Sequence, residues 1–258
     1  MRKIMVAACV LATALFVAGP ASALPTLEEL AGKIAKAAAE RKTCSCDMKV
    51  TMALLGVTAV GSGLQVEMVV TKDGKTVSKS CCMLAGSMKT PDGQEVKIEQ
   101  KTVSDGTYHW QESNTAGAVT VTKEFADSKD EMGVPRGIEP AKEFEELWMA
   151  MYELRVTAED TVNGEPVYVL EGKFRDAYLE KNPAAEPAKQ MMNSVKMALS
   201  RNDFYPRRIA FRDADGNATI AMDLSNVKIN VPVDEKLFTY APPEGAQVDD
   251  KTKPQEEN

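Results

Sequence analysis

The stretches CSCDMKVTMAL at residues 44–54 and LQVEMVVT at residues 64–71 decide the fold. In both of them apolar side chains alternate with polar ones, which is the period-two pattern of a strand that buries one face. The sequence Lys72-Asp73-Gly74-Lys75 that follows them is typical of a tight turn between antiparallel strands. The two stretches therefore predict an antiparallel meander with one apolar face. The apolar positions that we expect on this face are Met48, Val50, Met52, Leu64, Val66 and Met68.

The same patterns extend to both ends of the chain. A helix is expected at residues 27–41, because Thr26 and Glu29 form a capping box and apolar residues follow at helical spacing. Two more amphipathic helices are predicted at residues 141–154 and 188–199. Further strands are expected at residues 77–88, 95–103, 107–112, 118–124, 155–160, 166–175, 207–213, 218–224 and 226–230. The fold class is mainly β, with one strongly curved sheet and helices near its concave side.

The N-terminus has the features of an export signal. Arg2 and Lys3 precede an apolar run at residues 4–18, and small residues follow as far as Ala23. This pattern indicates a signal peptide at residues 1–23 and a mature chain that begins near Leu24. Lipid attachment at Cys9 is the alternative, but that position leaves almost no apolar region before the cut. We expect an exported, periplasmic protein with one domain at residues 24–248 and a disordered polar tail at 249–258.

The charge balance is acidic. Without Arg2 and Lys3 the chain has 29 basic and 38 acidic residues, a net charge of −9. This balance disfavours nucleic acid and anionic membrane surfaces as main partners.

Four cysteines remain after the expected cleavage, namely Cys44, Cys46, Cys81 and Cys82. In an exported protein an even number favours disulfides, and we expect Cys44 or Cys46 to be linked to Cys81 or Cys82. Four thiolates could instead hold zinc or copper(I), although their spacing is not that of a structural zinc site. Both alternatives stay open at this stage.

No motif for catalysis or for a cofactor is found in the sequence. His109 is the only histidine, and it lies in a predicted strand between two aromatic residues. The acidic run Glu143, Glu145 and Glu146 is typical of a solvated helix face, and the sequence at residues 213–217 favours a hairpin over a calcium loop. We therefore expect neither an enzyme nor a bound metal or cofactor.

The C-terminal part carries a resemblance to a known family. The chain reads LSNVKIN at residues 224–230 and LFTYAPPEGAQVDD at residues 237–250, and Ser104-Asp105-Gly106 lies shortly before Trp110. This closely resembles the LolA-like periplasmic carriers of outer-membrane lipoproteins, and the helix-then-meander order extends the resemblance over the mature chain. It implies an incomplete β-barrel with helices as a lid over a hydrophobic cavity. The family's early Arg-Pro pair is matched here by Thr90-Pro91, so its lid-holding arginine is missing.

The resemblance implies a partner with acyl chains, either a lipoprotein or another lipid, and membrane-bound donors and acceptors. The carrier is expected to be a monomer. Methionine adapts well to irregular apolar ligands, and the helix at 141–154 carries an apolar stripe suited to a lid. The residues expected at the cavity are Met48, Val50, Met52, Leu64, Val66, Met68, Trp110, Phe144, Leu147, Trp148, Met151, Met191 and Val195. A periplasmic sensor of the same fold and a soft-metal or redox protein are the alternative functions.

Overall fold

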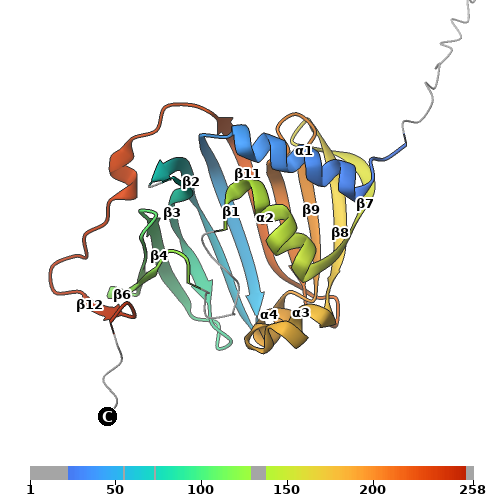
Figure 1. The fold of residues 1–258 in the computed structure, drawn as a ribbon. Helices are drawn as coiled ribbons and strands as arrows, with labels where there is room; N and C mark the ends of the chain where they lie inside the picture. Colours follow the sequence, from blue (N-terminus) through green and yellow to red (C-terminus); the bar gives the residue numbers. More distant parts are fainter. Residues whose placement is uncertain (1–22, 55, 73, 129–137, 254–258) are drawn as a thin grey trace, which may run out of the picture.

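One open sheet of twelve strands forms the framework of the protein (Figure 1). The computed structural model describes residues 23–54, 56–72, 74–128 and 138–253, so the expected signal peptide lies outside it apart from Ala23. The strand order is β12-β6-β5-β4-β3-β2-β1-β11-β10-β9-β8-β7. Neighbouring strands in these ranges are antiparallel, except that β12 runs parallel to β6. The mainly β fold class and the curved antiparallel sheet are thus confirmed.

The strands follow the alternating stretches of the sequence, with longer bounds than expected in most cases. They are β1 (Thr43–Leu54), β2 (Val57–Lys72), β3 (Lys75–Lys89), β4 (Glu95–Ser104), β5 (Tyr108–Thr115), β6 (Ala118–Phe125), β7 (Tyr152–Val162), β8 (Glu165–Phe174), β9 (Ser194–Ser200), β10 (Pro206–Arg212), β11 (Ala218–Ile229) and β12 (Gln247–Asp250).

The helices are short apart from the first. They are α1 (Leu27–Glu40), α2 (Pro140–Glu143), the π-helical turn η1 (Phe144–Met149), α3 (Asp176–Lys181), η2 (Pro183–Ala185), α4 (Glu186–Met191) and η3 (Glu235–Phe238). None of the helices in the described ranges combines the length and the apolar character that crossing a membrane requires.

The capping box at the start of α1 is present as expected. The Thr26 hydroxyl accepts a hydrogen bond from the backbone N–H of Glu29 at 3.2 Å, and the Glu29 carboxylate accepts one from the N–H of Thr26 at 2.9 Å. Figure 1 shows α1 and α2 lying across the same face of the sheet, in front of β1, β11 and β9. We call this covered face the inner face and the opposite one the outer face.

The register between β1 and β2 places their apolar residues on opposite faces of the sheet. Leu54 pairs with Val57, so even-numbered residues of β1 pair with odd-numbered residues of β2. Met48 therefore lies beside Gly63 on the inner face, while Leu64 pairs with Asp47 on the outer face. Because a shift of one residue moves a whole strand to the other face, the single apolar face expected from the sequence is wrong.

The chain's own C-terminal segment covers the apolar outer face. Val66 and Val103 pack against Phe238, which is only 2% exposed. Beyond this segment β12 pairs with β6, with Val248 beside Val121. The disordered tail expected from Asp249 is therefore wrong for its first residues, and residues 254–258 lie outside the described ones.

The expected helix at residues 188–199 is also wrong. α4 ends at Met191, and the rest of the segment forms β9 between β8 and β10. In β9, Val195, Met197, Ala198 and Leu199 are all buried. Periodicity alone does not distinguish a short buried apolar run in a strand from one in a helix.

Two other boundaries differ from the expectation. The helical segment after Pro140 gives way to β7 at Tyr152, and β7 includes Leu154, which was expected to be helical. The two strands expected at 218–224 and 226–230 form the single strand β11. Asn226 has a positive φ of 50°, and the pairing with β1 shifts between Ser45 and Asp47, as in a β-bulge.

Candidate functional site

A cavity of about 300 Å³ lies between the inner face of the sheet and the layer formed by α1, α2 and η1. We call it the inner cavity. Its walls are mostly apolar and come from both helices and from strands of both halves of the sheet. The apolar side chains that line it are Ile34, Ala38, Met48, Ile138, Pro140, Phe144, Trp148, Met197, Leu199, Phe204, Pro206, Ile209, Met222 and Leu224.

Strand pairing brings the floor of the inner cavity together. Met48 of β1 is the cross-strand neighbour of Leu224, and Ile209 of β10 is the neighbour of both Met222 and Met197. Cross-strand neighbours point to the same face of a sheet, so these side chains form one continuous apolar floor.

The roof of the inner cavity is fixed by an aromatic cluster. Trp148 stacks on Phe211 and on Tyr152, with ring centroids 6.2 Å apart in both pairs. The Tyr152 hydroxyl donates a hydrogen bond to the carbonyl of Met192 at 3.0 Å, so the cluster is tied to the chain beyond α4. Trp148 lies in the π-helical turn η1, and such turns occur frequently at functional sites.

One end of the inner cavity is polar. Glu67 of β2 accepts hydrogen bonds from Gln65 at 2.5 Å and from the Tyr205 hydroxyl at 3.4 Å. The Arg41 guanidinium lies 4.6 Å from the centre of the Tyr205 ring. Glu143 of α2 faces this end from above, since it lines the cavity together with Glu67.

The electrostatics at this end are unfavourable for two negative charges. Burial raises the pKa of Glu143, because it removes the carboxylate from water, and the negative charge of Glu67 raises this pKa further. A hydrogen bond from Trp148 partly lowers it again. The Glu143 side chain is exposed, and it also lines the cavities that lie beneath the helix. Glu143, Glu145 and Glu146 are thus all exposed, as expected of a solvated helix face.

A second, polar cavity of about 700 Å³ adjoins the first, and the two share Glu67, Ser78, Ile138 and Glu143 as wall residues. We call it the polar cavity. Its other lining residues lie mainly on β3, β4 and β5 and on the loops beside them. They include Lys75, Thr76, Ser80, Ser104, Thr107, His109, Asp127 and Leu147. Together the two cavities form an apolar compartment followed by a polar one.

The residues predicted for the cavity fall into three groups. Met48, Phe144 and Trp148 line the inner cavity, and Leu147 lines the polar one. A second group lies on the inner side or in the core around it, and consists of Val50, Met52, Met151, Met191 and Val195. A third group lies on the outer face under the C-terminal segment, and consists of Leu64, Val66, Met68 and Trp110.

The expectation that the third group lines the same cavity as Met48 is wrong, because these side chains lie on the opposite face of the sheet. For the other residues a role in binding stays a prediction. Several wall residues were not predicted from the sequence, including Ala38, Glu67, Tyr205 and Ile209. Met222 and Leu224 could have been found, because they alternate with polar residues in a stretch that was recognised as a strand.

Cys44, Cys46, Cys81 and Cys82 are free, and no disulfide joins any two of them. Cys46 and Cys82 both pair with Gln65, so β2 lies between them. Strands lie about 4.8 Å apart, and two strands of separation exceed the Cα distance of about 7 Å that a disulfide spans. The expected link between the two cysteine pairs is therefore wrong.

The arrangement of the cysteines also disfavours the soft-metal alternative. Cys44, Cys46 and Cys82 point to the inner face, while Cys81 packs on the outer face beneath Phe238. In the described ranges no three potential ligands from histidine, cysteine and acidic residues lie close enough to hold a metal ion. Burial raises the pKa of Cys44 and of Cys46 to about 12, which disfavours their thiolates at neutral pH.

Alkylation should label all four of these cysteines when the protein is unfolded without reductant. In the folded protein Cys44 and Cys46 should react much more slowly than free thiols, because they are 1% and 2% exposed and their thiols stay protonated. Peptide mass spectrometry after alkylation measures both states. A disulfide-linked peptide that joins residue 44 or 46 to residue 81 or 82 would contradict the register.

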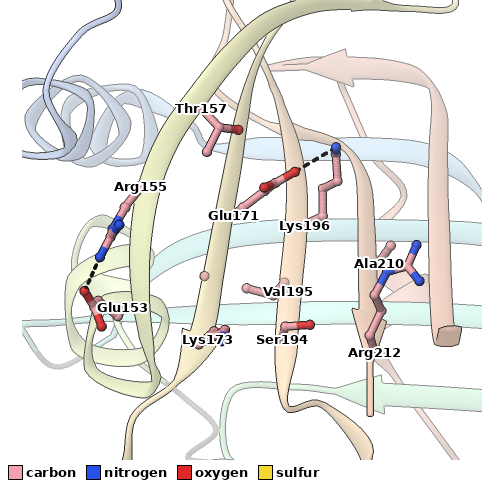
Figure 2. Close-up of a pocket in the computed structure, with 11 residues that line it drawn as sticks. Glu153, Arg155, Thr157, Glu171, Lys173, Ser194, Val195, Lys196, Ala210 and Arg212 are labelled. Carbon is pink, nitrogen blue, oxygen red and sulfur yellow. Dashed lines mark hydrogen bonds and ion pairs between the residues drawn. The ribbon is translucent and has the colours of Figure 1, made fainter. Parts of the chain in front are cut away.

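A hollow of about 580 Å³ on the outer face of β7 to β10 is charged rather than apolar (Figure 2). Two ion pairs line it, one between Arg155 and Glu153 of β7 at 2.7 Å and one between Lys196 of β9 and Glu171 of β8 at 2.8 Å. All four side chains are about half exposed or more, and exposed pairs contribute little to stability. This hollow has the character of a solvated sheet face.

No family model matches the chain, and no curated protein matches its sequence. Among solved structures, LprF from Mycobacterium bovis is 11% identical, with 80% of this chain and 94% of that chain covered and a TM-score of 0.44. A conserved protein from Thermus thermophilus, described as uncharacterized, is 12% identical, with coverages of 87% and 98% and a TM-score of 0.42. A chain of the Pseudomonas aeruginosa MucA/MucB complex is 14% identical, with coverages of 82% and 60% and a TM-score of 0.40.

Proposed function

We propose that this protein captures the acyl chain of a lipid or lipoprotein in the inner cavity and carries it in aqueous surroundings. The observation that carries the proposal is the apolar cavity of about 300 Å³ between the α1 and α2 layer and the sheet. Protein cores are close-packed, and few of their voids are larger than a water molecule. Away from its polar end, the methionine, leucine and tryptophan walls of this cavity are better suited to an apolar ligand than to water.

The walls favour an unbranched, adaptable ligand. Met48, Met197 and Met222 contribute long side chains that change shape at low cost. Glu67 and Glu143 limit the apolar surface to one end, so the ligand should have one polar and one apolar end. An acyl chain with a polar head group has this shape.

We further propose that the protein is exported, that it acts in the periplasm and that it passes its ligand to the outer membrane. The proposal of export is supported by the charged and apolar pattern of residues 2–23. Capture of this kind needs no covalent step, and we propose that the protein is not an enzyme. Gentle purification followed by lipid mass spectrometry should identify an acylated ligand, and a protein partner without lipid would favour the sensor alternative.

Bromine atoms on an acyl chain should quench the fluorescence of Trp148 and not that of Trp110. Trp148 lines the inner cavity, whereas Trp110 stacks on Tyr240 at 5.3 Å on the outer face. The chain has only these two tryptophans, so each can be observed alone. Titration of Trp110→Phe with a brominated fatty acid should lower its fluorescence in a saturable manner.

Trp148→Phe is the matched control, because it keeps an aromatic ring in the roof and leaves Trp110 as the reporter. Its fluorescence should stay unchanged over the same titration. Equal quenching of both variants would place the ligand on the outer face or on no defined site, and the proposed function would then fail.

A further inference from the structure

The strongest feature of the polar cavity is a pair of carboxylates on opposite walls. Glu67 belongs to the floor, on β2, and Glu143 belongs to the roof, on α2. Both residues line the inner cavity and the polar cavity, so they lie where the two compartments meet. A head group joined to an acyl chain in the inner cavity would have to pass between them.

Other charged groups leave this region acidic. Asp127 adds a third carboxylate to the polar cavity, where Lys75 is an exposed lysine at the start of β3. Arg41 lies at the polar end of the inner cavity over the ring of Tyr205, and its positive charge offsets part of the negative charge of Glu143. His109 lies on β5 among the lining residues. Among the described residues that line the two cavities, three carboxylates against one lysine and one arginine leave a net negative wall.

We infer that the polar cavity takes an amine head group, so that the preferred ligand is a single-chain amphiphile with a cationic end. This inference rests on the proposed function and adds the chemical class of the ligand to it. An ammonium between Glu67 and Glu143 would be attracted by both carboxylates and would relieve their mutual repulsion. An anionic head group would add a further negative charge to the same place.

Hydrogen bonding favours the same class of head group. An ammonium has N–H donors and no acceptor, so each donor needs an oxygen nearby. Besides the carboxylates, the hydroxyl groups of Ser78, Ser80, Ser104 and Thr107 line the polar cavity and can accept. Burial, followed by the negative charge of Glu67, raises the pKa of Glu143, and an ammonium between the two carboxylates would counter the effect of Glu67.

The inference is tested by competition among three amphiphiles with the same dodecyl chain, used below their micelle concentrations at neutral pH. Dodecylamine is cationic, dodecyl glucoside is neutral and dodecanoate is anionic. Each displaces a neutral apolar dye, N-phenyl-1-naphthylamine, from the purified protein. Dodecylamine should bind about tenfold more tightly than dodecanoate, which corresponds to about 1.4 kcal/mol, and the glucoside should lie between them.

Glu143→Gln should reduce this preference to about threefold or less, because it removes one of the two charges and keeps the shape. Glu146→Gln is the matched control, since Glu146 lies on the same helical segment, is exposed and lines neither cavity. It should keep the tenfold preference. The ranking in the unmodified protein already tests the inference, even where a variant folds poorly.

The outcomes separate this inference from the proposed function. Equal binding of the three amphiphiles, or tighter binding of dodecanoate, would overturn the amine head group and leave acyl-chain capture intact. Failure of the dye and of all three amphiphiles to bind would overturn the proposed function and the inference with it.

Discussion

Replacement of Ala38 by tryptophan should weaken binding of an acyl probe about 100-fold while the protein stays folded. Ala38 lies on α1, is 5% exposed and lines the inner cavity. An indole at this position would occupy space that the ligand needs, and the loss of contact with a few methylene groups, at about 0.8 kcal/mol each, accounts for this effect. Titration with the probe and thermal unfolding of the same sample measure binding and folding separately.

Ala39→Trp is the matched control, because Ala39 is the next residue of the same helix and is exposed. It should bind the probe as the unmodified protein does. Unchanged binding by Ala38→Trp would show that the probe occupies another place. A large fall in unfolding temperature for Ala38→Trp alone would show that the space beside α1 is too small for a ligand.

Those parts of the fold that depend on local sequence could be predicted. The capping box formed by Thr26 and Glu29 places the start of α1, and the alternation from Cys44 onward gives β1. These signals are reliable because each depends on neighbours within a few residues of the chain. The helix expected at 188–199 was wrong because the run Met197, Ala198 and Leu199 is buried by distant parts of the chain, and such burial is not a local property.

The faces of the sheet could not be predicted, for a different reason. Both β1 and β2 carry an apolar alternation, but the pattern does not tell how the two strands are aligned. Pairing of Leu54 with Val57 sets that alignment, and it directs Met48 and Leu64 to opposite sides. The alternation in each strand was therefore predicted correctly. The expectation that the two strands bury the same face of the sheet was wrong.

The sequence predicted those residues of the candidate site that lie together on one helical segment. Phe144 and Trp148 were found because helical spacing places them on one side of their segment. Leu224 reaches the same cavity through the pairing of β1 with β11, which are far apart in the chain. Glu143 is exposed, as the acidic run predicts, but the run gives no sign that this residue also lines a cavity.

The sequence also does not tell which of the two neighbouring arginines, Arg207 and Arg208, stabilises the fold. Arg207 is 6% exposed, and its guanidinium donates hydrogen bonds to Glu165 at 2.6 Å and 2.9 Å and to Asp203 at 2.6 Å. It also donates to the carbonyl of Tyr205 at 3.0 Å, which ties the network to a residue of the cavity wall.

Replacement of Arg207 by alanine should therefore lower the free energy of unfolding by about 3–5 kcal/mol, because Glu165 and Asp203 would keep their charges without the buried partner. A loss of this size is a large part of the roughly 5–15 kcal/mol that stabilises a typical domain. The matched variant Arg208→Ala breaks an exposed pair with Asp223, whose side chains are 55% and 39% exposed, and should cost about 1 kcal/mol or less. Urea unfolding of both variants measures the difference. Equal losses in the two would mean that the Arg207 network is no stronger than a surface ion pair.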